Sequence, residues 1–271
     1  MKKISKSPLF SFVVLTYVIF LLFFMVIGIS IMLDAPESVI NILQTIAAWS
    51  STFAFIILFK KIYPGLRLKD FIKQQFAQKL SFSVLGTVVS IQVIIIAVTI
   101  FLLSKTTDTQ VLALSFTGLG LMFLTFLDKL VKGPLGEELG WRGYALNELQ
   151  KKYSPLNSAL IVGFLWGFWH TPLWFTSGYT DMKLIKYIVL FMIGIISFSI
   201  IVTFFYKINK NLMIPIVMHQ IFNFSLVLIK GDLLDILVYV MLSYFAVAVI
   251  LIVINPKEIL YKKSIGKDVN I

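Results

Sequence analysis

The sequence contains no cysteine among its 271 residues, and it has few charged side chains. Without cysteine the chain can form neither a disulfide nor a thiolate metal site. Charged residues make up 14% of the chain, whereas soluble domains carry about 25%. This shortage of charge excludes an ordinary soluble domain.

The chain is instead predominantly apolar, with 59% hydrophobic residues and a mean hydropathy of +0.94. Apolar runs of about 18 or more residues, which are typical of membrane-spanning helices, recur along it. We therefore expect an all-α, polytopic membrane bundle in a single integral-membrane domain, residues 1–271. The eight expected spans are 9–33, 39–59, 82–104, 111–128, 157–176, 184–206, 212–229 and 233–254, with a further helix at 133–150.

The net charge of +11 is distributed unevenly between the expected loops. If the N-terminus is cytoplasmic, 20 of the 24 Lys and Arg residues fall on the inner side and four on the outer side. Since Lys and Arg favour the cytoplasmic side, we expect a plasma-membrane protein with both termini in the cytoplasm. The basic charge would then face anionic lipid rather than nucleic acid. The segment 63–80, which contains several basic residues, is expected to form an interfacial helix or an ordinary loop.

The two histidines of the chain, His170 and His219, both fall inside expected spans. Ionisable groups at such depth cost on the order of 2.5–3.5 kcal/mol on insertion scales and usually mark a site. Asn223 shares a helix face with His219, so the two side chains could stabilise one oxyanion or join neighbouring helices. Trp166 shares a face with His170 and is expected to pack beside it. Trp174 is expected in an interfacial aromatic belt.

Adjacent carboxylates occur in the stretch GPLGEELGWRG, residues 133–143. Its Gly-Pro pair is typical of a helix start. Glu138 and Arg142 are four residues apart and are expected to form an ion pair. Glu137 lies about 100° further round the helix, outside that pair. Glu137 could therefore accept and return a proton, although two solvated loop carboxylates are the alternative.

Together these polar residues make a site for peptide-bond hydrolysis in a membrane. Glu137 is expected to take a proton from water that His170 helps to hold. His219 and Asn223 would stabilise the tetrahedral oxyanion. The ion pair next to Glu137 would hold the first helix in place.

Three ordered motifs carry a resemblance to a known family. They are Glu-Glu-x-x-x-Arg at 137–142, aromatic-x-x-x-His at 166–170, and His-x-x-x-Asn at 219–223. The set resembles the CAAX-prenyl-protease and bacteriocin-processing intramembrane proteases, called CPBP or Abi, with a catalytic core over residues 110–230. The second motif usually begins with Phe, so we expect Trp166 to alter only packing. The resemblance implies an all-helical bundle, a polar cavity open to the cytosol, and glutamate-dependent hydrolysis.

The resemblance also bears on cofactors and partners. Family members have been described as metalloproteases, and Glu137, His170 and His219 would make a catalytic zinc set. Direct activation of water by Glu137, with no cofactor required, is the favoured alternative. The expected partners are the lipid bilayer and a peptide or membrane-protein substrate, prenylated or not. The short Lys- and Ile-rich loops favour a bacterial origin.

Two other classes of protein compete with a protease. One is a non-catalytic membrane scaffold that regulates a partner, although such relatives of the family tend to lose Glu or His positions that this chain keeps. The other is a transporter with a proton relay, which the lack of internal repeats disfavours. Neither the H-E-x-x-H nor the G-x-S-x-G motif occurs in the sequence.

Overall fold

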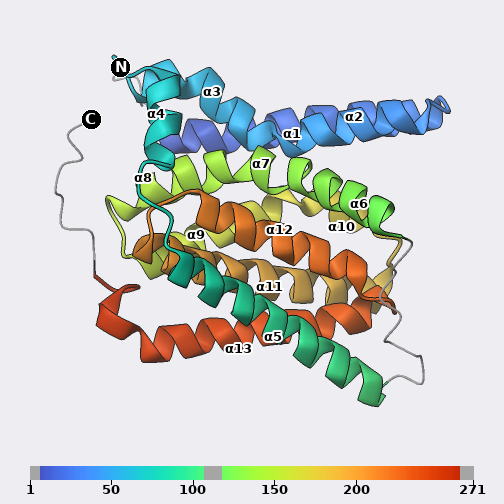
Figure 1. The fold of residues 1–271 in the computed structure, drawn as a ribbon. Coiled ribbons are helices and arrows are strands. Elements are labelled where there is room, and N and C mark those ends of the chain that lie inside the picture. The colour runs from blue at the N-terminus through green and yellow to red at the C-terminus, as the bar shows by residue number, and fades with distance from the viewer. Residues whose placement is uncertain (1–6, 107–117, 263–271) are drawn as a thin grey trace.

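The computed structural model describes residues 7–106 and 118–262, and all regular secondary structure within them is helical. The helices pack into one bundle (Figure 1). In chain order they are α1 (Pro8–Met32), α2 (Glu37–Ala48), α3 (Ser50–Ile62), α4 (Leu68–Gln75), α5 (Phe82–Thr106), α6 (Leu119–Val131), α7 (Pro134–Glu138), the π-helix η1 (Leu139–Leu146), α8 (Asn147–Gln150), α9 (Pro155–Trp169), α10 (Thr171–Phe175), α11 (Asp181–Ile208), α12 (Met213–Leu228), α13 (Leu233–Ile254) and the 3₁₀ turn η2 (Pro256–Glu258).

Within the described residues, four helices are long and apolar enough to cross a membrane: α1, α5, α11 and α13. Helices α2 and α3 add a fifth if this pair, bent by 48°, is one span. The expectation of an all-α protein with several membrane spans is confirmed at this level. The expected span 111–128 begins in residues 107–117, which lie outside the described part of the chain.

Local sequence signals account for several helix starts. Ser7, Ser154 and Asp232 each accept hydrogen bonds from backbone N–H groups in the first turn of α1, α9 and α13. Such caps satisfy donors that have no partner within the helix. In α1 and α9 a proline follows the cap, where its missing N–H costs nothing.

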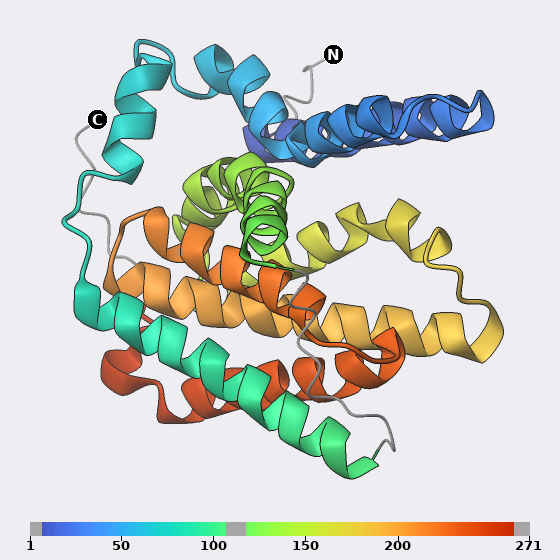
Figure 2. The same ribbon diagram turned by 45° about the vertical axis from the view of Figure 1, so that its right-hand side comes forward.

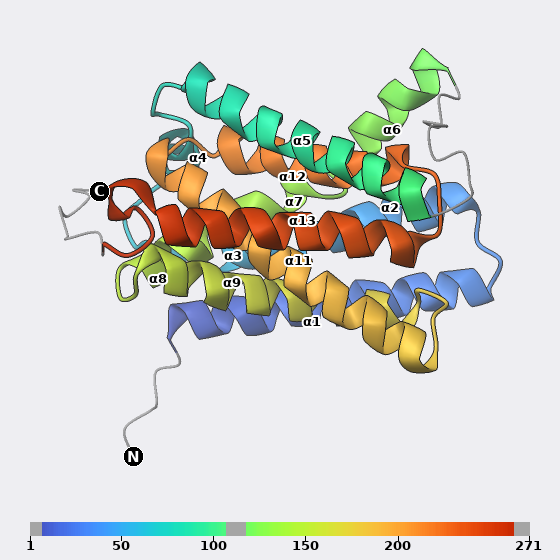
Figure 3. The ribbon, with the colours of Figure 1, turned by 90° about the horizontal axis from the view of Figure 1, so that it is seen from below.

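The helices run back and forth along the bundle, and α11 lies at its centre. Helix α1 begins and α13 ends at the end of the bundle that holds α4, which we call the α4 end (Figures 1 and 2). Helix α11 packs against both α9 and α13 (Figure 3). Gly163 permits the close approach of α9, because a Cβ there would lie 3.0 Å from the Cα of Ile196.

Residues 119–150 form one interrupted run of helices, from α6 through α7 and η1 to α8. The run crosses the bundle and reaches the α4 end at α8 (Figure 1). The expected helix 133–150 is present, but η1 interrupts it with a π-helical turn. Lys129 lies in α6, Lys132 follows its last residue, and Arg142 lies in η1. They belong to the crossing run, because α7 continues the path of α6 after a short break.

For residues 63–80 the sequence allowed two alternatives, an interfacial helix or an ordinary loop. The structure contains a helix there, α4. Its buried face carries Phe71, whose ring centroid lies 5.0 Å from that of Phe55 and 5.2 Å from that of Tyr63. Lys69 and Lys73 are exposed on the opposite face. The helix is therefore amphipathic and is fixed to α3 by aromatic packing.

Candidate active site

The break between α6 and α7 is held by the bend between α2 and α3. The Nε1–H of Trp49 donates a hydrogen bond of 2.9 Å to the carbonyl oxygen of Val131, the last residue of α6. The hydroxyl of Ser51 lies 3.4 Å from the carbonyl oxygen of Gly136 and 3.2 Å from that of Glu137. These contacts fix the backbone of the first turn of α7, which carries Glu137.

Glu138 is the centre of a buried charge cluster. Its Oε1 accepts a 3.1 Å hydrogen bond from Nη1 of Arg142, as expected from their spacing, and both side chains are fully buried. The same Oε1 lies 2.7 Å from Nδ1 of His219. Since a carboxylate only accepts, Nδ1 carries the hydrogen and Nε2 remains available for other contacts. The cluster thereby joins η1 to α12.

The carboxylate of Glu137 is buried and has a specific partner. Its Oε2 accepts a 2.6 Å hydrogen bond from Nε1–H of Trp166. The indole ring also contacts the rings of His170 and His219, at centroid distances of 5.7 and 5.1 Å. The guanidinium of Arg142 lies 4.1 Å from the centroid of the Trp166 ring. Trp166 therefore packs beside the histidine as expected. A phenylalanine could not make the bond to Glu137, so the expectation that Trp166 alters only packing is corrected.

His170 ends α9 with its ring held in one orientation. Its Nδ1 lies 2.8 Å from the carbonyl oxygen of Trp166, which can only accept a hydrogen bond. Nδ1 therefore carries the hydrogen, and in the neutral ring Nε2 keeps its lone pair. An imidazole in this state can accept a hydrogen bond from water.

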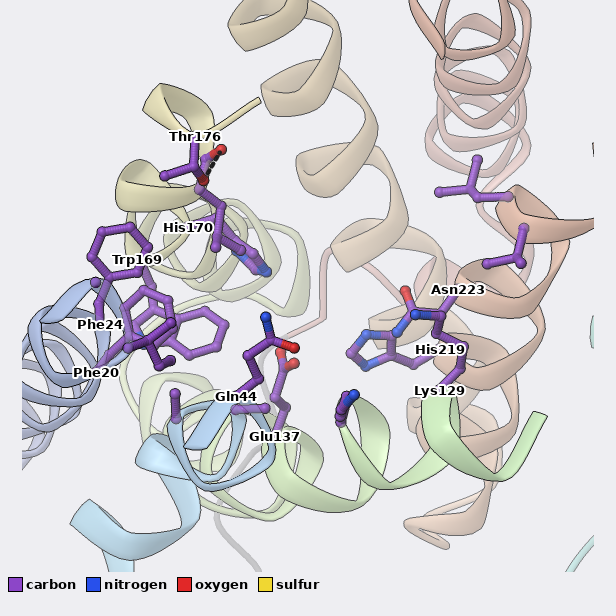
Figure 4. A pocket seen from close by; sticks show the side chains of 18 of the residues that line it. Phe20, Phe24, Gln44, Lys129, Glu137, Trp169, His170, Thr176, His219 and Asn223 are labelled. Atoms are coloured by element: carbon purple, nitrogen blue, oxygen red, sulfur yellow. Dashed lines mark hydrogen bonds between the residues drawn. The ribbon is translucent and has the colours of Figure 1, made fainter. Parts of the chain in front are cut away.

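Four residues expected to be catalytic line one cavity of about 800 Å³: Glu137, His170, His219 and Asn223 (Figure 4). A Cβ built on Gly133 would lie 2.5 Å from Nδ2 of Asn223 and 3.6 Å from Nε2 of His219. These two potential donors therefore lie beside the same glycine.

The cavity has a further set of walls that the sequence did not indicate. Phe20, Phe24 and Ile27 of α1 form an apolar wall, and Gln44 of α2 adds an amide. From Glu137 the lining extends to residues near the ends of α1, α10 and α12, away from the α4 end. This part of the lining thus lies toward the opposite end of the bundle from the start of α1.

Sequence reasoning missed the contribution of α1, α2 and α3, because these helices carry no motif of charged residues. A signal was present in the polar run Trp49 to Ser51, which interrupts an apolar stretch. Trp174 was placed in an interfacial aromatic belt, and this is corrected. It is 5% exposed, and its ring centroid lies 6.0 Å from that of Phe191, so it belongs to the protein interior.

The expected zinc ligands do not form a metal site in this arrangement. Among the residues that the structure describes, no three His, Asp or Glu side chains are placed to hold one ion. Trp166 contacts both imidazoles and donates a hydrogen bond to Oε2 of Glu137. No step proposed below uses a metal.

The site as a whole comprises a buried carboxylate, two imidazoles and an amide around one cavity in a helical bundle. Residues 121–225 match the family described as type II CAAX prenyl endopeptidase Rce1-like. A CAAX prenyl protease 2 from Methanococcus maripaludis is 32% identical over 108 residues, or 38% of this chain and 40% of that protein. The similarity thus covers less than half of this chain and less than half of that relative. The family match contains the four catalytic candidates and lies within the expected core 110–230.

Proposed function

We propose that the protein is an intramembrane endopeptidase that hydrolyses a peptide bond of a membrane-associated or peptide-precursor substrate. The observation that carries the proposal is the shared cavity, in which the carboxylate of Glu137 faces the same space as His170, His219 and Asn223. The Rce1-like match over this segment supports the choice of reaction.

Glu137 acts as the general base and then as the acid. Its carboxylate takes a proton from water, and the oxygen of that water attacks the carbonyl carbon of the scissile peptide bond. Nε2 of His219 and Nδ2 of Asn223 donate hydrogen bonds to the resulting oxyanion. The carbon–nitrogen bond then breaks, and the proton held by Glu137 passes to the leaving amine. The products are a new carboxyl terminus and a new amino terminus.

The remaining residues of the site position these groups. Nε2 of His170 accepts a hydrogen bond from the attacking water and limits its orientation. Glu138 holds the Nδ1–H of His219, so that Nε2 can take up a second proton and donate. Arg142 balances the charge of Glu138 within the protein interior. Trp166 fixes one oxygen of Glu137 and leaves the other for water.

We further propose eight spans in the plasma membrane with both termini in the cytoplasm. Each expected span has a helical counterpart, with α6 to α8 serving as the fourth. The α4 end gathers the basic residues of α3, α4 and the turn between α8 and α9. In that orientation the lining residues near the ends of α1, α10 and α12 lie on the side away from the cytosol. The resemblance implies a cavity open to the cytosol, and that expectation stays a prediction.

The reaction is tested with a library of membrane peptides and purified protein in water enriched in ¹⁸O. Hydrolysis predicts that mass spectrometry finds cleaved peptides with one ¹⁸O atom in the new carboxyl terminus. A library that stays intact with folded protein would contradict the proposal and favour the scaffold hypothesis.

The zinc hypothesis is tested in the same assay. Activity that survives a strong chelator and exhaustive dialysis is expected when Glu137 activates water directly. Loss of activity that added zinc restores would contradict direct activation and require ligands that rearrange from the structure described above.

A further inference from the structure

Gln44 adds a polar group to the cavity that the proposed hydrolysis does not use. We propose that its amide binds the main chain of the substrate, where it holds the N–H and C=O groups of one residue. That residue precedes the scissile residue, which is the one that contributes the carbonyl of the cleaved bond. This inference rests on the proposed function and adds to it a residue that positions the peptide.

The amide of Gln44 is the hydrogen-bonding group of the cavity wall formed by α2. The other residues of α2 in the lining are Ala47 and Ala48. In Figure 4 the amide points into the cavity beside the carboxylate of Glu137. It has no hydrogen-bond partner among the residues that the structure describes. Ligand cavities usually have apolar walls with a few polar groups of this kind, which orient the ligand.

Two hydrogen bonds hold the stretch of chain that carries Gln44. On one side of it, Oδ1 of Asn41 accepts a 3.0 Å hydrogen bond from Nζ of Lys132. On the other side, Nε1–H of Trp49 donates a 2.9 Å hydrogen bond to the carbonyl oxygen of Val131. Both bonds join α2 and its bend to the end of α6, directly before the turn that carries the proposed base. The amide is thereby held in place relative to the base, as a residue that positions a substrate must be.

The proposed oxyanion donors reach the cavity from a different helix. His219 and Asn223 belong to α12, and Figure 4 shows them and Gln44 facing the same space. In an extended chain the N–H and C=O groups of one residue point to the same side, and those of the next residue point to the opposite side. A peptide whose scissile carbonyl points to α12 therefore directs the main-chain groups of both neighbouring residues away from α12. The amide of Gln44 can donate to the carbonyl and accept from the N–H of one such neighbour.

Of the two neighbours, the preceding residue is the better partner for Gln44. The N–H of the following residue belongs to the leaving amine, which receives the proton of Glu137, so its contacts change during the reaction. The main-chain groups of the preceding residue stay the same from the uncleaved peptide to the product. A contact with main-chain groups suits any side chain, so Gln44 orients the substrate without selecting its sequence.

The test uses the peptide cleaved most rapidly in the library experiment and an ester analogue of it. In the analogue an ester oxygen replaces the N–H of the residue that precedes the scissile residue, so one donor is lost with little change of shape. The wild-type protein should cleave the analogue with a KM about fivefold higher and an unchanged kcat. A neutral hydrogen bond is worth about that factor, and a contact made equally before and during the reaction changes KM alone.

The same two peptides are compared in Gln44→Met, which keeps the length of the side chain and removes the amide. Its KM for the normal peptide should rise about tenfold, because both hydrogen bonds are lost. It should then bind the ester analogue as well as the normal peptide. Gln74→Met, at an exposed position of α4, is the matched control and should behave as the wild type with both peptides.

Three results would overturn the inference while leaving the proposed hydrolysis intact. They are equal KM values of the wild type for peptide and analogue, a difference between the two that survives in Gln44→Met, and a lower kcat with unchanged KM in Gln44→Met. The third result would assign the amide to the attacking water or to Glu137 instead of the peptide. The absence of any cleavage by the wild type would overturn the proposed function itself.

Discussion

At the scale of single residues, Glu138 shows why two adjacent carboxylates occur in so apolar a chain. Glu138 serves the fold, since it binds Arg142 and His219 and is fully buried. Glu137 serves the cavity, since only Trp166 binds its Oε2 in the structure described. The two neighbours differ in role because successive helix positions point about 100° apart.

Arg142→Ala should destabilise the protein strongly. Removal of one partner of a buried ion pair leaves an uncompensated charge and costs about 3–5 kcal/mol. Thermal unfolding in detergent should show a lower transition temperature together with lost activity. Arg67→Ala is the matched control, because the exposed Arg67 pairs with Asp70 at the surface. An equal effect of both substitutions would contradict the structural role of Arg142.

Trp166→Phe should lower activity with little effect on folding. The ring contacts remain, but the hydrogen bond to Glu137 is lost, and a bond to a charged group is worth about 1.5–3 kcal/mol. We expect kcat to fall by about tenfold or more. Trp174→Phe is the control, since Nε1 of Trp174 has no hydrogen-bond partner among the described residues. Unchanged turnover in Trp166→Phe would show that the bond does not position the base.

The sequence was sufficient to name the polar residues of the site, because charged and imidazole groups are conspicuous in an apolar chain. The sequence was not sufficient to predict which of these residues contact each other across helices. The contact of Nδ1 of His219 with Glu138 joins residues 81 positions apart, and the bond from Trp166 to Glu137 spans 29. Helical periodicity relates residues three or four apart and is silent on such contacts.

At the scale of elements, the turn that carries the two glutamates depends on the bend between α2 and α3. Trp49 and Ser51 bind carbonyl groups of α6 and α7 across the bundle. A single π-helical segment follows in η1, and such segments are frequent at functional sites. The π-helical segment has no local sequence signal, which is why the sequence predicted an uninterrupted helix over 133–150.

Gly140→Ala should disturb the contact between η1 and α3. A Cβ at this position would lie 2.7 Å from Cβ of Ser51 and 2.8 Å from its carbonyl oxygen. Backbone must therefore shift, and overpacking of this kind costs about 1–3 kcal/mol. Gly86→Ala in α5 is the matched control, since nothing lies within 4 Å of a Cβ there. A lower unfolding temperature for Gly140→Ala alone is expected, and equal temperatures would contradict the close packing.

At the scale of the whole molecule, composition sufficed to predict a multi-span helical protein, because helices satisfy every backbone hydrogen bond inside a bilayer. The path of each span was harder to predict. The break at Gly133 and Pro134 was taken as the end of a span, whereas the chain continues across the bundle through α7 and η1. Tertiary contacts from α3 stabilise this continuation, and no local pattern encodes them.

The orientation in the membrane can be tested cleanly, because the chain has no native cysteine. Lys73→Cys in α4 and Ser38→Cys in α2 introduce single thiols at exposed positions near opposite ends of the bundle. With cytoplasmic termini, an impermeant maleimide added to intact cells should label the thiol at position 38 and not the one at position 73. The reverse pattern would contradict cytoplasmic termini and invert the topology.

The central claim is that Glu137 activates the water that hydrolyses the peptide bond. The measurement that tests it most directly is the cleavage rate of one identified peptide by wild type, Glu137→Gln and Glu148→Gln, the last a glutamate on α8 outside the cavity. Loss of a general base predicts a fall of about 10²–10⁴-fold for Glu137→Gln, with an unchanged unfolding temperature and retained peptide binding. Glu148→Gln should match the wild type. Cleavage by folded Glu137→Gln at the wild-type rate would contradict the account.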